Sequence, residues 1–348
     1  MDELVNAICH EISLKNADWP QRKVKTIYFG GGTPSVLSEN HLLEIFTAIK
    51  KNYDLSALEE CTLEANPEDI TKEIIGIWDS LGIDRISLGV QSWNDDLLKK
   101  INRNHNSTDT ERSLELLAGS NINKLSLDLI YGIPGQDEKD IYTFFKKLET
   151  YKVGHFSAYA LTKEDKTLLD VQVKRGLITM PEEEQYWDLF KTVLSASKKH
   201  GYDQYEISNY CLSGQEAVHN TGYWFGMPYL GFGPGAHSFN GYIRRWNIAS
   251  IHKYKAAIKN QSIFHEQETL TKQDRYNELI LTRLRTKWGI VPSIIQEKFP
   301  DFDKHFTHKV KEFEDKGLVN VFSDRITLNP DGLFLCDYIS SEMMVDNE

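Results

Sequence analysis

Apolar residues in the first half of the chain form two alternating patterns, short continuous runs and longer stretches with helical spacing. Continuous runs bounded by glycine or polar residues are typical of buried strands, and apolar residues spaced three and four apart are typical of helices. The runs predict strands at 24–29, 60–64, 84–90, 125–131 and 155–160. The spaced positions predict helices over 3–15, 38–49, 71–82, 94–101, 108–118 and 138–150. Strands that alternate with helices indicate parallel βαβ units with right-handed crossovers.

The pattern changes in the last quarter of the chain. An amphipathic helix at 182–199 and a glycine-rich segment at 229–241 are expected to extend the first domain. After residue 262 the pattern predicts helices at 271–286, 292–299 and 303–316 and a hairpin of strands 319–322 and 325–328. Helices followed by a hairpin resemble a winged helix. We therefore predict an α/β domain over 1–262 and a winged-helix-like α+β domain over 263–348.

Charge argues against nucleic acid as a partner. The chain has 51 acidic and 40 basic residues, a net charge of −11. The helix at 303–316, which would be the recognition helix, carries as many acidic as basic side chains. A balanced helix in an acidic protein is a poor surface for phosphate, so DNA binding is not favoured. No apolar run is as long as a membrane span and no signal peptide is recognised, which predicts a cytoplasmic protein.

The four cysteines do not form a metal-binding motif. Cys9, Cys61, Cys211 and Cys336 lie far apart in sequence and none belongs to a CxxC pair. Buried reduced thiols are the expectation for each, because free cysteine behaves as a small apolar residue.

Polar residues recur where the predicted strands end. Thr33, Glu64, Gln91 and Asp128 are separated by 31, 27 and 37 residues, about one βα unit each. Because the carboxyl ends of parallel strands face a common site, we expect these four side chains to converge on one ligand. Glycines 30–32 allow close approach of the backbone, and Arg103 adds a cation that can bind a carboxylate through two bonds. These groups suit an amino acid joined to a ribose.

A second glycine motif fails as a dinucleotide site. Gly231, Gly233 and Ala236 match the fingerprint of such sites as a string. Pro234 and the residues that follow do not open a helix, and no acidic ribose ligand follows at the required distance.

Four sequence blocks resemble one known family. They are YFGGGTPS at 28–35, LEANPE at 63–68, RISLGVQS at 85–92 and DLIYGIPGQ at 128–136. Their order and spacing are similar to those of the oxygen-independent coproporphyrinogen III oxidase family of the radical S-adenosylmethionine (SAM) superfamily. The resemblance extends from near residue 2 to the C-terminus. It implies an incomplete (β/α)6 barrel without its first strand, followed by the family's C-terminal domain.

The resemblance also implies a site for SAM. Its contacts would be Gly31, Gly32, Thr33, Glu64, Gln91, Arg103, Asp128, Thr162 and His237. We assign Glu64 and the glycine-loop carbonyls to the ammonium group and Arg103 to the carboxylate. Gln91 and Asp128 would then bind the ribose hydroxyls.

Within this family, residues 219–224 are similar to the HNxxYW signature of HemW-type haem chaperones. His219, Asn220, Tyr223 and Trp224 would then contact haem, with His219 or another residue as the iron ligand, since imidazole is a common axial ligand. The alternative is a packed loop in which His219 is bonded to backbone. The resemblance implies that the protein transfers haem to respiratory proteins. It also implies transient contact with a membrane, without a membrane span, and it is compatible with a homodimer. The rival function is that of an oxygen-independent coproporphyrinogen III dehydrogenase.

The CxxxCxxC loop that holds the 4Fe–4S cluster in the family is not in this sequence. Cys9 lies within the first predicted helix without a partner cysteine and is not a cluster ligand. We expect a late-assigned start or a truncation more than a true loss, because without the first strand the strand at 24–29 would be an unpaired edge.

Because its sequence has no CxxxCxxC motif, this chain is predicted not to cleave SAM reductively. Anaerobic reconstitution with iron and sulfide, followed by iron analysis, checks this. We expect no stoichiometric cluster, and a content of about four irons per chain would contradict the prediction.

Overall fold

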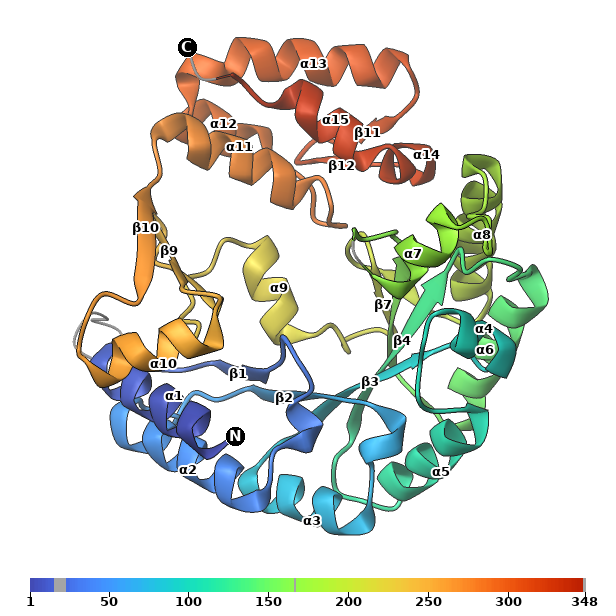
Figure 1. Ribbon diagram of the computed structural model, residues 1–348. Coiled ribbons are helices and arrows are strands. Elements are labelled where there is room, and N and C mark those ends of the chain that lie inside the picture. The colour runs from blue at the N-terminus through green and yellow to red at the C-terminus, as the bar shows by residue number, and fades with distance from the viewer. Residues whose placement is uncertain (16–22, 166, 347–348) are drawn as a thin grey trace. The chain divides into compact units, whose positions relative to one another are not determined.

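The computed structural model describes residues 1–15, 23–165 and 167–346. The chain divides into two compact units (Figure 1). Residues 25–39 and 58–217 form one, which we call the sheet unit. Residues 1–24, 40–57 and 218–348 form the other, which we call the helical unit. The segment 229–241, expected to extend the first domain, belongs to the helical unit, and the domain boundary at residue 262 stays a prediction.

The sheet unit is built on a seven-stranded sheet in the order β1-β2-β3-β4-β5-β7-β6. Five consecutive neighbours are parallel, as the alternation of strands and helices predicted. They are β1 (Thr26–Phe29), β2 (Glu60–Ala65), β3 (Arg85–Gln91), β4 (Lys124–Tyr131) and β5 (His155–Ala160). Two short antiparallel strands that the sequence did not predict extend the sheet beyond β5, namely β7 (Asn209–Cys211) and β6 (Asp203–Gln204).

Helices follow the parallel strands in chain order. They are α3 (Lys72–Leu81), α4 (Asp95–Lys100), α5 (Ser107–Ala118), α6 (Glu138–Thr150), α7 (Leu168–Lys174) and α8 (Glu183–Lys199), with 3-10 turns η1 (Pro34–Val36) and η2 (Pro67–Asp69). Their starts follow from local chemistry: the side chains of Thr71, Asn106 and Asp137 accept bonds from the first free backbone N–H groups. Gly82 ends α3 because it adopts a φ of 85°, which residues with a Cβ rarely adopt.

The two faces of the parallel sheet differ in polarity. Leu63, Leu88, Leu127 and Phe156 are fully buried from four adjacent strands and lie on one face. Helix α6 packs there, since the ring of Phe145 meets that of Phe156 edge-on at 5.2 Å. The alternate positions carry polar side chains, which lie on the opposite face because successive residues of a strand point to opposite sides.

The helical unit combines helices with two antiparallel sheets. Its first sheet joins β8 (His237–Phe239), β9 (Ile243–Asn247) and β10 (His265–Thr269), and its hairpin joins β11 (Val319–Val321) and β12 (Ile326–Leu328). Its helices are α1 (Asp2–Lys15), α2 (Glu39–Asn52), α9 (Val218–Trp224), α10 (Ile251–Lys259), α11 (Lys272–Arg283), α12 (Pro292–Lys298), α13 (Asp303–Asp315), α14 (Pro330–Phe334) and α15 (Cys336–Met343). The predicted α/β class, with a helical segment followed by a hairpin near the C-terminus, is confirmed.

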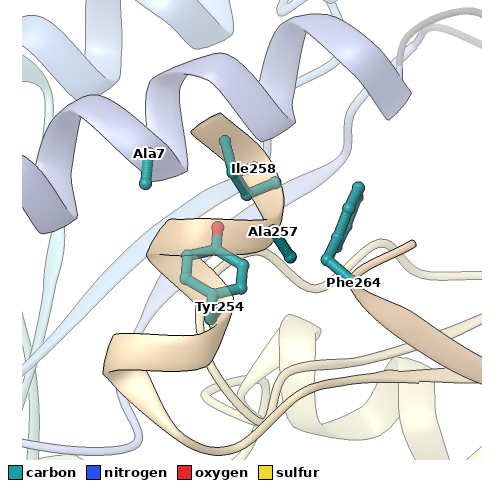
Figure 2. Packing of buried hydrophobic residues seen from close by; sticks show 5 residues of the cluster. All are labelled: Ala7, Tyr254, Ala257, Ile258 and Phe264. Carbon is teal, nitrogen blue, oxygen red and sulfur yellow. The ribbon is translucent and has the colours of Figure 1, made fainter. Parts of the chain in front are cut away.

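Figure 2 shows the apolar contact that joins α1 to α10. Ala7 lies on α1, and Tyr254, Ala257 and Ile258 lie on α10, with Phe264 beside them. The small side chain of Ala7 lets the two helices approach closely.

A buried charged network lies beside this apolar contact. Glu11, fully buried, forms an ion pair of 2.7 Å with Lys15, and the Tyr254 hydroxyl donates to its second oxygen at 2.5 Å. Asn247 and the backbone N–H of Gly233 also donate to this carboxylate. A buried charge is tolerated only when it is fully bonded, so each of these partners is needed.

Among the described residues, no helix combines the length and the apolar character that crossing a bilayer requires.

Replacing Tyr254 by Phe is expected to lower the free energy of unfolding by about 1 to 3 kcal/mol, because it removes one donor from a buried carboxylate. Urea unfolding followed by circular dichroism measures the change. Tyr242→Phe is the matched control, since that side chain is 61% exposed. Equal stability of the Tyr254→Phe variant and the wild type would contradict the role of this bond.

Candidate functional site

In the amino-terminal half of the polar face, the polar side chains form ion pairs and hydrogen bonds with one another. Arg85 on β3 forms a buried ion pair of 2.9 Å with Glu60 on β2. The Ser126 hydroxyl lies 2.7 Å from Nδ1 of His155, whose Nε2 lies 2.8 Å from the Tyr205 hydroxyl. Burial, with a contribution from Arg85, lowers the pKa of His155 to about 3, so its ring is neutral. These groups satisfy one another and stabilise the sheet.

In the carboxyl-terminal half of the polar face, the carboxylate of Glu64 is fixed by two hydrogen bonds. Glu64 on β2 accepts the Tyr28 hydroxyl at 2.7 Å and the Gly31 backbone N–H at 3.2 Å. A Cβ at Gly30 would lie 2.5 Å from the Tyr28 ring and 2.7 Å from a Glu64 oxygen, and Gly31 has a φ of 80°. Glycine is therefore favoured at position 30 by the close approach of Tyr28 and Glu64, and at position 31 by the positive φ.

Asp128 lies on the same face, two strands away. Its carboxylate accepts the Ser87 hydroxyl at 3.4 Å and that of Ser157 on β5. Burial, reinforced by the negative charge of Glu64, raises the pKa of Asp128 to about 7. The expectation that Asp128 ends its strand is wrong: β4 continues to Tyr131, and Asp128 reaches the polar face from within the strand.

Gln91 ends β3 in a strained conformation. Its φ is 65°, unusual for a residue with a Cβ, and the pairing of β3 with β4 shifts register between Leu88 and Gln91. The side chain is 5% exposed, and its carbonyl oxygen Oε1 has no hydrogen-bond partner among the described residues. A strained residue with an orphaned acceptor indicates that a donor, such as a ligand hydroxyl, is missing from its surroundings.

Arg103, on the loop after α4, supplies positive charge. One guanidinium nitrogen, Nη1, donates to Oδ1 of Asn66 at 3.4 Å. Within the described part of the chain no carboxylate lies within ion-pair distance of it, and the carboxylate of nearby Glu68 lies 3.2 Å from Nδ1 of His105. Burial lowers the pKa of Arg103, while Glu68 and Asp128 act on it in the opposite sense. A half-buried guanidinium without an ionic partner is suited to an anionic ligand.

The predicted residues do not all belong to this group. Gly31, Glu64 and Asp128 lie on or beside the polar face, Gln91 ends β3, and Arg103 contacts Asn66. Gly32, Thr33 and Thr162 are exposed, and the Thr162 hydroxyl donates to the carbonyl of Ala160 at 3.4 Å. His237 is on β8 of the helical unit, where its ring stacks on Trp246. Sequence reasoning missed Tyr28, Asn66 and Ser157.

We call Glu64, Gln91, Arg103 and Asp128 the strand-end group. Their side chains fit SAM but do not fit an iron–sulfur cluster. A carboxylate, a guanidinium and an orphaned amide match the ammonium, carboxylate and ribose hydroxyls of that molecule. In residues 1–15, 23–165 and 167–346, no three His, Cys, Asp or Glu side chains are grouped to hold a metal ion. Cys61, Cys211 and Cys336 are buried separately, and Cys9 is half-buried. These cysteines do not fit a 4Fe–4S cluster.

The second group of predicted residues lies on helix α9. Nε2 of His219 is 3.0 Å from the Tyr223 hydroxyl, and the two rings meet edge-on at 4.9 Å. Burial against Tyr229 raises the pKa of Tyr223 to about 12, so its phenol stays protonated. The indole nitrogen of Trp224 has no partner among the described residues. An imidazole can bind the iron of a haem, and neighbouring aromatic rings can pack against the flat macrocycle.

Comparison with known families gives two matches. Residues 13–148 match the radical SAM superfamily, and residues 270–335 match the HemN C-terminal domain. The chain is 35% identical to the "Heme chaperone HemW" of Lactococcus lactis over 93% of this chain and 86% of that protein. It is 33% identical to the "Heme chaperone HemW" of Bacillus subtilis, over 96% and 89% of the two chains.

A solved structure has the same fold. Coproporphyrinogen III oxidase (HemN) of Escherichia coli superposes with a TM-score of 0.84, covering 99% of this chain and 83% of that one at 19% identity. The predicted radical SAM fold, with the C-terminal domain of this family, is therefore confirmed. The roles predicted for individual side chains stay predictions.

The wild type is expected to lose stability relative to Asp128→Asn as the pH rises from about 4 to about 7. The folded pKa of Asp128 is about 7 against an ordinary value of 3.8, so the folded state binds this proton more tightly. Thermal melting between pH 4 and pH 8 measures the difference. Asp188→Asn, a half-exposed position on α8, is the control. A constant difference in melting temperature across this window would contradict the assignment.

Proposed function

Since the chain belongs to the HemW family of radical SAM proteins, we propose that it binds haem and SAM and transfers haem to respiratory proteins. The observation that carries the cofactor part is that, among the described residues, Arg103 has no carboxylate partner and Oε1 of Gln91 has no hydrogen-bond partner. The observation that carries the haem part is the His219–Tyr223 pair on α9.

The strand-end group supports SAM binding through complementary charge. Glu64 would bind the ammonium group together with carbonyls of the glycine loop, and Arg103 would bind the carboxylate. Gln91 and Asp128 would bind the ribose, and Asp128, with its pKa about 7, can donate as well as accept. Gly32, Thr33, Thr162 and His237 are proposed as further contacts from the family resemblance.

The α9 group supports haem binding through its chemistry. We propose His219 as the axial ligand, because the raised pKa of Tyr223 opposes a phenolate ligand at neutral pH. The Tyr223 hydroxyl lies 3.0 Å from Nε2 of the His219 ring, so this contact would have to open for Nε2 to bind iron. Asn220 and Trp224 would contact the macrocycle.

The superfamily implies a 4Fe–4S cluster that activates bound SAM. The residues of this chain do not supply its ligands, and we derive no step that uses it. What this chain contributes is binding and orientation of the nucleoside and its amino acid.

The rival function is oxidative decarboxylation of coproporphyrinogen III, the activity in the name of the E. coli structure. The similarity to HemW proteins at 33% and 35% identity favours the chaperone. We further propose a cytoplasmic protein that meets membrane-bound acceptors transiently and forms a homodimer.

Replacing His219 by Ala is expected to weaken haem binding about tenfold or more, because an axial ligand is lost. Titration of the full chain with haem, followed by the Soret band, measures the affinity. His252→Ala is the control, since that histidine is exposed on α10.

Two results would overturn this proposal. Unchanged haem affinity and an unchanged Soret spectrum in His219→Ala would remove the ligand assignment. Conversion of coproporphyrinogen III under anaerobic conditions, without stable haem binding, would favour the enzyme.

A further inference from the structure

Asn66 occupies a helix start but does not cap it. It is the residue before η2, the position from which Asn usually accepts a backbone N–H bond. Its side chain makes no such bond. Oδ1 instead accepts from Nη1 of Arg103 at 3.4 Å. The side chain is therefore used to orient the guanidinium, at the expense of the cap.

The space for this contact comes from a glycine. A Cβ at Gly89 on β3 would lie 3.4 Å from Oδ1 of Asn66 and 3.1 Å from Nε2 of Gln91. Any larger residue at position 89 would press on both amides. Gly89 thus lets the side chains of Asn66 and Gln91 lie next to the strand end, where Arg103 meets Asn66.

The neutral charge of Asn66 decides what Arg103 can bind. An aspartate has the same shape, but at this distance it would form an ion pair with the guanidinium and compensate its charge. The amide oxygen orients the guanidinium without adding a negative charge at hydrogen-bond distance. The turn carries two acidic side chains of its own: Glu68 lies 3.2 Å from Nδ1 of His105, and Asp69 accepts the Ser35 hydroxyl at 2.6 Å.

We propose that Asn66 is a positioning and specificity residue, which aims Arg103 at the carboxylate of an amino-acid-bearing nucleoside and, being neutral, does not itself compete for the guanidinium as an ionic partner. This inference rests on the proposed SAM site. It adds a residue outside the predicted contacts and a reason for its amide: the site selects ligands with a free carboxylate over nucleosides without one.

The test compares two ligands on the full chain by isothermal titration calorimetry. SAM carries the carboxylate, and 5′-methylthioadenosine lacks the amino-acid part. In Asn66→Asp the affinity for SAM should fall about tenfold or more, because an internal ion pair competes with the ligand. The affinity for 5′-methylthioadenosine should change by less than about twofold, which a general distortion of the site would not produce.

Two further variants separate charge from packing. Asn66→Ala removes the orienting oxygen without adding charge, so its loss of SAM affinity should be smaller than that of Asn66→Asp. In an Arg103→Gln background, Asn66→Asp should change SAM affinity by less than about twofold, because the partner of the new charge is gone. Circular dichroism and thermal melting confirm that each variant is folded.

The outcomes distinguish this inference from the function on which it rests. If the wild type binds no SAM, the proposed cofactor site fails and this inference fails with it. If the wild type binds SAM and Asn66→Asp binds it equally well, or loses both ligands in parallel, only the role of Asn66 is overturned.

Discussion

The alternation of side chains along five parallel strands is the constraint on which the candidate cofactor site depends. Parallel sheets are usually apolar on both faces, because helices cover both. Here Leu63, Leu88 and Leu127 form one buried apolar face, and the positions between them are polar. Because the strands are in parallel register, Glu64 lies opposite Ser87, and Asp128 lies opposite Ser157. A polar face of this kind is stable only if its groups bond to one another or to a ligand.

The two halves of that face meet this requirement differently. In the amino-terminal half, the Glu60–Arg85 pair and the neutral His155 are satisfied internally. In the carboxyl-terminal half, as far as the structure describes the chain, an oxygen of Gln91 has no hydrogen-bond partner, Arg103 has no carboxylate partner, and the pKa of Asp128 is raised. In the proposed complex, the hydroxyls of SAM would bond to Gln91 and Asp128, and its carboxylate would pair with Arg103. The strained backbone of Gln91 would then serve to place its side chain for the ligand.

The sequence predicted the parallel strands because their apolar runs and the helix signals between them are local. It also predicted that Glu64 and Asp128 converge, but by the rule of strand ends, which misplaces Asp128 within β4. The alternation in ECTLE and in LSLDL would have placed Asp128 on the face of Glu64 directly. Asn66 was not predicted, since its choice between capping η2 and meeting Arg103 depends on contacts between segments distant in sequence. The short strands β6 and β7 carry too few residues to form a pattern.

Helix α9 was missed for a related reason, and its weakness bears on function. It has seven residues, none of them fully buried, so its short length and partial burial stabilise it only weakly. Tyr223, Phe225 and Met227 each remain about two fifths exposed at its C-terminal end. A flat apolar ligand on His219 would supply the burial that the protein does not. Stability of this segment would then rise with ligand concentration, as mass action requires. Under the proposed function, bound haem would add these contacts to α9, and release to an acceptor would require only their loss.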